Sequence, residues 1–138
     1  MKDHAAFILR NEDKVLFVQR AATKRVLPNI WAFPSGTVEE GELVEATAIR
    51  EAMEELGVEV VVEDTLAVTE LPEMGVRIHF IICKVITGVP QIMQPEEIQT
   101  LAWMTMPEFF NTFSDEQIGH GLIWLRAHPE VWQKYFSI

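Results

Sequence analysis

The chain has 138 residues, of which 49% are hydrophobic and 23% are charged, a composition typical of a globular protein rather than a disordered segment. It holds one cysteine, Cys83, so it can form neither an internal disulfide nor a zinc site built from several thiolates. A formal net charge of −10 repels a nucleic-acid backbone, and polymeric DNA or RNA is therefore not expected as a partner.

The chain begins with two short apolar runs, residues 4–10 and 14–19, on either side of the polar turn Asn11-Glu12-Asp13. Two runs of this length around a polar turn predict a β-hairpin. Charged residues interrupt the apolar sequence too early for a signal peptide or a membrane span. We therefore expect a cytoplasmic protein that makes no membrane contact.

The next part of the chain predicts a long loop followed by a helix. Residues 21–41 contain two prolines and two glycines, which predicts a loop with a short strand near residues 31–33. Residues 43–56 have helical periodicity and are followed by Gly57, a residue type that commonly ends helices.

The second half of the chain predicts another hairpin and then a strand and helices. Two β-branched, apolar runs at residues 58–69 and 76–86 flank a turn region and predict the hairpin. The remaining expected elements, in chain order, are a strand near residues 99–104, a short helix from Pro107, and helices at about residues 115–127 and 129–136. Together these elements predict a mixed β-sheet with helices on its faces.

Three glutamates of the predicted helix share one face. Because each helical residue turns the chain by roughly 100°, Glu51, Glu54 and Glu55 project within an arc of roughly 100°. A bound Mg²⁺ or Mn²⁺ would remove their mutual repulsion, since hard cations prefer oxygen ligands. An acidic helix face in solvent explains the same trio, so the trio alone is weak evidence. The opposite face, expected to anchor the helix on the sheet, holds Ala46, Ile49, Met53 and Leu56.

The loop before this helix strengthens the metal-site interpretation. Gly36 and Gly41 bracket the loop, and glycine permits a positive φ and close approach of the backbone to a ligand. Arg50 can reach back to Glu39 or Glu42, which would hold the loop against the helix.

Residues 36–58 resemble the Nudix box at every defined position. The match runs Gly36, five residues, Glu42, seven residues, Arg50-Glu51-Ala52, one residue, Glu54-Glu55, one residue, and Gly57-Val58. Such a long match arises by chance far less often than a short glycine motif does. The chain is therefore identified as a member of the Nudix family. This resemblance implies an α/β fold in which residues 1–138 form one α/β/α sandwich domain, with a mixed sheet flanked by helices.

The resemblance also implies a set of metal ligands. Glu54 and Glu55 are expected to bind the metal ion, which is Mg²⁺ with Mn²⁺ as the alternative. Glu51 is expected to bind it too, or to act as the base that activates water. The backbone carbonyl of Ser35 is expected to be a further ligand, although the family frequently has glycine at this position.

Other segments are expected to complete the site. Glu97 is expected to supply one more acidic group from a later loop, with Glu96 as the alternative. Arg50 is also expected to belong to the catalytic site, because its contacts would hold the loop in place. Arg20, at the end of an early strand, is expected to bind the substrate phosphates, and Trp31 is a candidate platform for the base.

The activity implied by the resemblance is metal-dependent hydrolysis of a diphosphate linkage in a small-molecule nucleotide. The compact size favours a nucleoside triphosphate, cleaved to the monophosphate and pyrophosphate. ADP-ribose or another nucleotide sugar is the alternative within the same chemistry. A non-catalytic nucleotide-binding domain is the alternative outside it, although such domains tend to have lost the box glutamates. Many family members are dimers, so a homodimer is one of the expected assemblies.

Overall fold

The computed structural model describes residues 1–136, and this part of the chain forms one seven-stranded sheet with four α-helices and two 3₁₀ turns. The strands are β1 (Lys2–Asn11), β2 (Lys14–Arg20), β3 (Trp31–Ala32), β4 (Ser35–Thr37), β5 (Glu59–Leu71), β6 (Val76–Thr87) and β7 (Ile98–Met104). The helices are α1 (Val44–Leu56), α2 (Met106–Thr112), α3 (His120–Ala127) and α4 (Pro129–Phe136), and the 3₁₀ turns are η1 (Pro72–Met74) and η2 (Asp115–Gln117).

The sheet is mixed, as the sequence predicts. Its strand order is β3-β2-β1-β6-β5, with β4 also paired to β1 and β7 to β2. The β1–β6 pair is parallel, whereas the other pairs are antiparallel. Both predicted hairpins are present, because β1 pairs with β2 next to the first turn and β5 pairs with β6 along most of its length.

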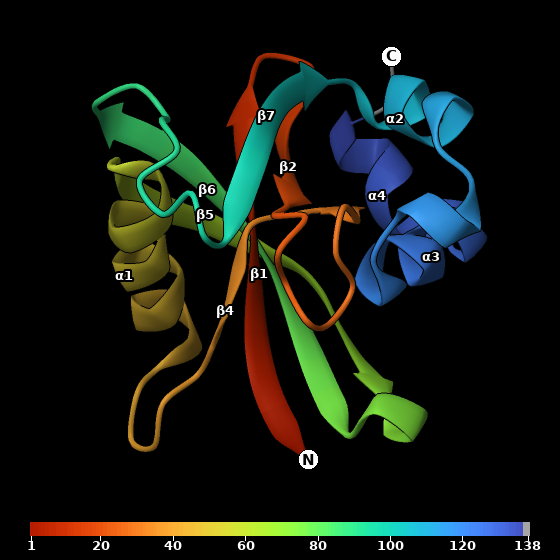
Figure 1. The fold of residues 1–138 in the computed structure, drawn as a ribbon, viewed down its shortest axis with the longest axis horizontal. Coiled ribbons are helices and arrows are strands. Elements are labelled where there is room, and N and C mark those ends of the chain that lie inside the picture. The colour runs from red at the N-terminus through yellow and green to blue at the C-terminus, as the bar shows by residue number, and fades with distance from the viewer. Residues whose placement is uncertain (137–138) are drawn as a thin grey trace.

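Alternating side chains of β1 divide the hydrophobic core into two layers. Ala6 and Ile8 belong to one cluster, and Phe7 and Leu9 belong to the other, because successive residues of a strand point to opposite faces. Helix α1 covers the layer of Phe7 and Leu9, and α2, α3 and α4 cover the opposite layer (Figure 1). Helices therefore lie on both faces of the sheet. No helix in residues 1–136 is long and apolar enough to cross a membrane.

Two segments near β3 differ from the prediction. Residues 115–127 do not form one helix, because Ile118 and Gly119 are extended between η2 and α3, with ψ values of 159° and 160°. Ile118 forms a β-bridge to Trp31, and the Gly119 N–H donates to the Trp31 carbonyl oxygen at 2.9 Å. Pairing with the sheet thus replaces a helical turn here. Pairing with β1 likewise makes Ser35–Thr37, expected to be loop, the short strand β4.

Candidate functional site

Helix α1 packs on the sheet with a different face from the predicted one. Three of the four residues expected to anchor it are exposed instead: Ala46, Ile49 and Met53. Ala48 and Ala52 are fully buried together with Leu56, because two small side chains let the helix lie close to the sheet. Glu55 is on this same side and is only 7% exposed. The helix is thus rotated about its axis relative to the prediction. As a result, its acidic face lies along the contact between the helix and the sheet.

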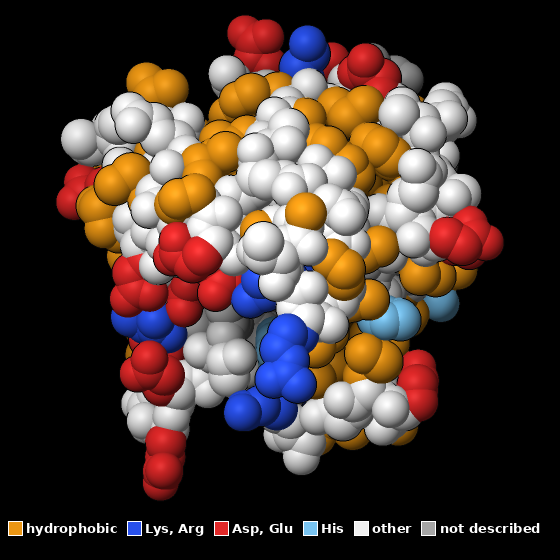
Figure 2. Space-filling view, in the orientation of Figure 1, with side chains coloured by type: hydrophobic (Ala, Val, Ile, Leu, Met, Phe, Trp, Pro, Cys, Tyr) orange, Lys and Arg blue, Asp and Glu red, His pale blue; other side chains and the backbone are white. Residues whose placement is uncertain are grey.

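A cavity of about 410 Å³ opens beside the acidic face of α1. Its walls come from α1, from β2, from β4 and the segment that joins β3 to β4, and from the loop before β7. The structure brings six of the residues predicted from the sequence to this cavity: Arg20, Ser35, Glu51, Glu54, Glu55 and Glu97. Acidic side chains gather beside α1 on the surface, with basic side chains next to them (Figure 2). We call this space the acidic cavity.

Arg50 ties the loop before α1 to the glutamates of the helix. Its Nε donates to Glu42 Oε2 at 2.8 Å, and its Nη1 donates to Glu51 Oε1 at 2.9 Å and approaches Glu54 Oε2 at 3.3 Å. Hydrogen bonds from Arg50 first, and then from the Thr47 hydroxyl, hold the pKa of Glu42 down at about 2. Arg50 itself does not line the acidic cavity. Its geometry therefore suits the positioning of other side chains, above all Glu51.

The Glu55 carboxyl group is buried and incompletely hydrogen-bonded. Within the described residues, its Oε2 atom is buried without a hydrogen-bond partner. Burial first, and then the hydrogen bond and charge of Glu51, raise the pKa of Glu55 to about 10. A buried acceptor without a partner costs about 1–3 kcal/mol. The fold thus keeps an unsatisfied oxygen in the wall of a cavity, where a cation can satisfy it.

The chemistry of the acidic cavity fits a hard divalent cation. Its carboxylates and backbone carbonyls offer oxygen ligands only, which suit Mg²⁺ or Mn²⁺. Among residues 1–136, no three acidic, histidine or cysteine side chains are already arranged around one point at the spacing of a metal site. Two of the carboxylates are instead paired with protein cations, Glu51 with Arg50 at 2.9 Å and Glu97 with Lys24 at 2.5 Å. A metal ion therefore has to compete with these ion pairs.

We expect metal binding to release a proton from Glu55. Because its pKa is raised to about 10, the free protein holds this carboxyl protonated at pH 7, whereas a metal ligand has to be a carboxylate. Metal affinity should therefore increase as the pH rises from 6 to 8. Calorimetric titration with Mn²⁺ in buffers of different ionisation enthalpy counts the released protons, and Glu55→Gln should abolish the release. A count of zero for the unmodified protein at pH 7 would contradict this assignment.

Gly36 provides space for Glu51. A Cβ atom at residue 36 would lie 2.2 Å from Glu51 Cγ and 2.7 Å from Glu51 Oε1, far inside the usual contact distance of about 3.5–4.0 Å. The φ of Gly36 is not in the left-handed region, in contrast to Gly41 with a φ of 78°. The glycine at residue 36 is thus required for close packing of an acidic side chain, and the glycine at residue 41 for the backbone turn.

Arg20 lies where the acidic cavity meets a second cavity and lines both of them. Its Nε donates to the Leu27 carbonyl oxygen at 3.1 Å, and its Nη2 donates to the Val26 carbonyl oxygen at 2.8 Å. These bonds hold the loop of residues 21–30 against the end of β2. Nη1 makes no hydrogen bond within the described residues, which leaves it available to an anion in the cavity.

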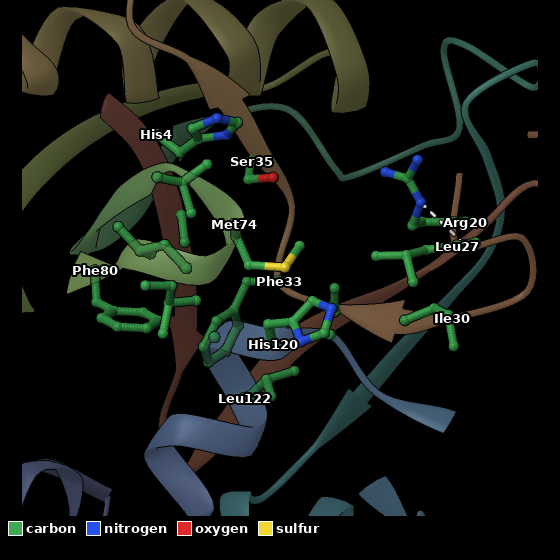
Figure 3. A pocket seen from close by; sticks show the side chains of 17 residues that line it. His4, Arg20, Leu27, Ile30, Phe33, Ser35, Met74, Phe80, His120 and Leu122 are labelled. Atoms are coloured by element: carbon green, nitrogen blue, oxygen red, sulfur yellow. Dashed lines mark hydrogen bonds between the residues drawn. The ribbon is translucent and has the colours of Figure 1, made fainter. Parts of the chain in front are cut away.

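The second cavity, of about 210 Å³, is mainly apolar (Figure 3). It shares Arg20, Ala32, Phe33 and Ser35 with the acidic cavity. Figure 3 shows Phe33, Met74 and His120 gathered around it, with His4 beside Ser35. Burial lowers the pKa of His4, which favours the neutral form of this imidazole. We call this space the apolar cavity.

The sequence provides no signal for the apolar cavity. His4 comes from β1, Met74 from the turn η1, Phe80 from β6 and His120 from the start of α3. No short motif joins these segments, and neither histidine has the spacing of a paired metal ligand in the sequence. Only the parallel pairing of β1 with β6 and the extended residues before α3 bring them together.

Besides Arg50, two sequence-predicted candidates, Trp31 and Glu96, line neither cavity. Trp31 lines neither of them; its ring stacks on Phe113 with 5.3 Å between the ring centroids and packs against the core. Alternation along β3 explains this placement, because Ala32, the next residue, faces the cavities. The role of Trp31 as a base platform thus gains no support. Glu96 is exposed and also lines neither cavity, which favours Glu97.

Comparisons with known proteins agree with this fold. The family profile described as NUDIX domain matches residues 2–123. Nudix hydrolase 2 of Arabidopsis thaliana is 31% identical over 109 residues, which cover 77% of this chain and 39% of that protein. The nucleoside triphosphatase NudI of Salmonella arizonae is 26% identical over 113 residues, which cover 74% of this chain and 80% of that protein.

A solved structure has the same architecture along nearly the whole chain. The NUDIX hydrolase from Nitrosomonas europaea superposes with a TM-score of 0.75 at 18% identity, covering 96% of this chain and 88% of that one. By contrast, the chain spans only 36–39% of the length of the first three curated relatives, all Nudix hydrolases of Arabidopsis thaliana.

Proposed function

Because this chain belongs to the NUDIX domain family, we propose that it hydrolyses a diphosphate linkage in a small nucleotide. The proposed substrate is a nucleoside triphosphate, and the proposed products are the monophosphate and pyrophosphate. The observation that carries this proposal is the junction of two unlike cavities, one acidic and one apolar, at Arg20, Phe33 and Ser35. A nucleoside triphosphate likewise joins a charged phosphate chain, through its sugar, to a flat aromatic base whose faces stack on aromatic side chains.

The acidic cavity suits a phosphate chain only when a divalent cation lies between the carboxylates and the phosphates. We propose that the ion is Mg²⁺, with Mn²⁺ as a substitute. The residues proposed to hold it are Glu51, Glu54, Glu55 and Glu97, with the Ser35 carbonyl. A cation bound there supplies a water of lowered pKa and screens the charge that develops on the leaving group.

The other side chains are proposed to position the substrate and the carboxylates. Arg50 holds Glu51 Oε1 at 2.9 Å, which fixes the orientation of a carboxylate proposed to bind the ion or to orient the attacking water. Arg20 is proposed to donate from its free Nη1 to a phosphate oxygen, since charge-assisted hydrogen bonds from arginine suit this partner. The base is proposed to lie in the apolar cavity, against Phe33 and Phe80.

A relative of comparable length supports a triphosphate over ADP-ribose. The protein named nucleoside triphosphatase NudI is matched along 80% of its own length. The presence of Glu51, Glu54 and Glu55 in the cavity wall supports catalysis rather than binding alone.

The proposal is tested by incubating the purified chain and Mg²⁺ with nucleoside triphosphates, ADP-ribose and nucleotide sugars, and identifying the products by mass. We expect monophosphate and pyrophosphate with the metal, and neither after EDTA, while the far-UV circular dichroism stays unchanged because the core does not need the metal. Release of AMP and ribose 5-phosphate would identify ADP-ribose as the substrate instead. Tight binding of one nucleotide without any turnover would identify a binding domain.

A further inference from the structure

The loop between β2 and β3 carries a cation to the edge of the acidic cavity. Lys24 Nζ lies 2.5 Å from Glu97 Oε2, and Glu97 lines the cavity together with the glutamates of α1. We infer that Lys24 is a phosphate-binding residue which, in the metal-free protein, takes the place of a cation beside Glu97. This inference rests on the proposed metal-dependent function and adds to it a residue outside the Nudix box.

Backbone hydrogen bonds hold Lys24 beside Glu97. The Ala21 N–H donates to the Glu97 carbonyl oxygen at 2.8 Å, and the Lys24 N–H donates to the Ala21 carbonyl oxygen at 3.2 Å. The Ala22 N–H donates to Gln99 Oε1 at 2.9 Å. These bonds fasten the start of the loop to the segment that carries Glu97. The Lys24 side chain is only 25% exposed, so it differs from a freely solvated surface lysine.

Lys24 also differs from Arg50, the other cation that pairs with a carboxylate of the cavity. Arg50 contacts Glu39, Glu42, Glu51 and Glu54, and its donors are committed to holding the loop. Lys24 has Glu97 as its single ion-pair partner in residues 1–136. An ammonium group has three N–H donors, so this pair leaves two of them for a phosphate oxygen.

Charge then determines how Lys24 acts in each state. In the metal-free protein, its ammonium neutralises Glu97 and competes with a metal ion for the carboxylate. Once a metal ion neutralises Glu97, the attraction between Glu97 and the Lys24 ammonium weakens. A phosphate in the cavity then becomes the better partner of the ammonium. Basic side chains lie next to the acidic ones on this face of the molecule (Figure 2). Lys24 therefore opposes metal binding in the free protein and favours phosphate binding in the loaded protein.

The variant Lys24→Met tests both effects, because it keeps an unbranched side chain and removes the charge. Mn²⁺ binding to the nucleotide-free variant, measured from the electron paramagnetic resonance of free Mn²⁺, is expected to be about threefold tighter, the scale of a partly exposed ion pair. Binding of inorganic pyrophosphate to the Mg²⁺-saturated variant, measured by calorimetry, is expected to be about tenfold weaker, the scale of a charged hydrogen bond. Tighter Mn²⁺ binding together with weaker pyrophosphate binding distinguishes this role of Lys24 from simple support of the loop.

Arg25→Met is the matched control. Arg25 is the next cation of the same loop, is exposed, and makes no hydrogen bond or ion pair with the part of the chain that the structure describes, so both binding constants should change less than about twofold. If the unmodified protein binds no Mn²⁺, the proposed function fails and this inference fails with it. If it binds Mn²⁺ and pyrophosphate but Lys24→Met shifts neither constant, or shifts both in one direction, only the role of Lys24 is overturned.

Discussion

Glu54→Gln is expected to lower turnover at least about 100-fold while the protein stays folded, the scale on which a side chain that activates or orients water contributes. Glu54 lines the acidic cavity, and its side chain is 46% exposed, so the fold does not depend on its charge. Glutamine has nearly the same shape, but its neutral amide is a poor ligand for a hard cation. The measurement is kcat with Mg²⁺, together with the midpoint of thermal unfolding.

Glu45→Gln is the control for this prediction. Glu45 lies in the first turn of the same helix, is exposed, and does not line the acidic cavity. The Glu45→Gln substitution removes the same charge from the same helix, so the turnover of this variant should match that of the unmodified protein. Turnover of Glu54→Gln within about threefold of the control would remove Glu54 from the proposed site, since loss of a required carboxylate is far more costly.

Gly36→Ala is expected to lower turnover by about 100-fold, because displacing a catalytic group by about 1 Å can have an effect of this size. The added methyl group would lie 2.2 Å from Glu51 Cγ, so Glu51 has to move out of its contact with β4. The backbone at residue 36 is not left-handed, and alanine therefore introduces no torsional strain. Steady-state kinetics with Mg²⁺ and far-UV circular dichroism should show a folded protein with low kcat.

A double-mutant cycle identifies the cause of this loss. In a Glu51→Ala background the Cγ atom that clashes is absent, so adding Gly36→Ala should change turnover and the free energy of unfolding very little. Contacting residues show such non-additivity, whereas independent residues have additive effects. Equal costs of Gly36→Ala in both backgrounds would rule out displacement of Glu51 as the mechanism.

Local spacing was sufficient to predict the acidic part of the candidate site. Arg50 contacts Glu42, and Glu51, Glu54 and Glu55 line one cavity. Both arrangements depend on which residues are neighbours along one helix and the loop that precedes it. The two hairpins were predictable for the same reason, because their strands are joined by short turns.

The rotation of α1 was not predictable from hydrophobicity. Ile49 and Met53 are the more apolar residues, yet Ala48 and Ala52 face the sheet. Close approach of the helix to the strands needs small side chains at the contact, and the gain from that packing depends on the shape of the sheet. The same packing buries Glu55 and leaves its Oε2 without a partner, a property that no spacing rule indicates.

The amino-acid sequence by itself determined the family, the mixed sheet with its helices, and which glutamates share a helix, because these follow from a contiguous motif and from local periodicity. Only the tertiary structure decided that Trp31 packs inward, that Lys24 pairs with Glu97, and that an apolar cavity adjoins the acidic one. These contacts join residues far apart in the chain, and their geometry depends on how the strands pair and how the helices pack.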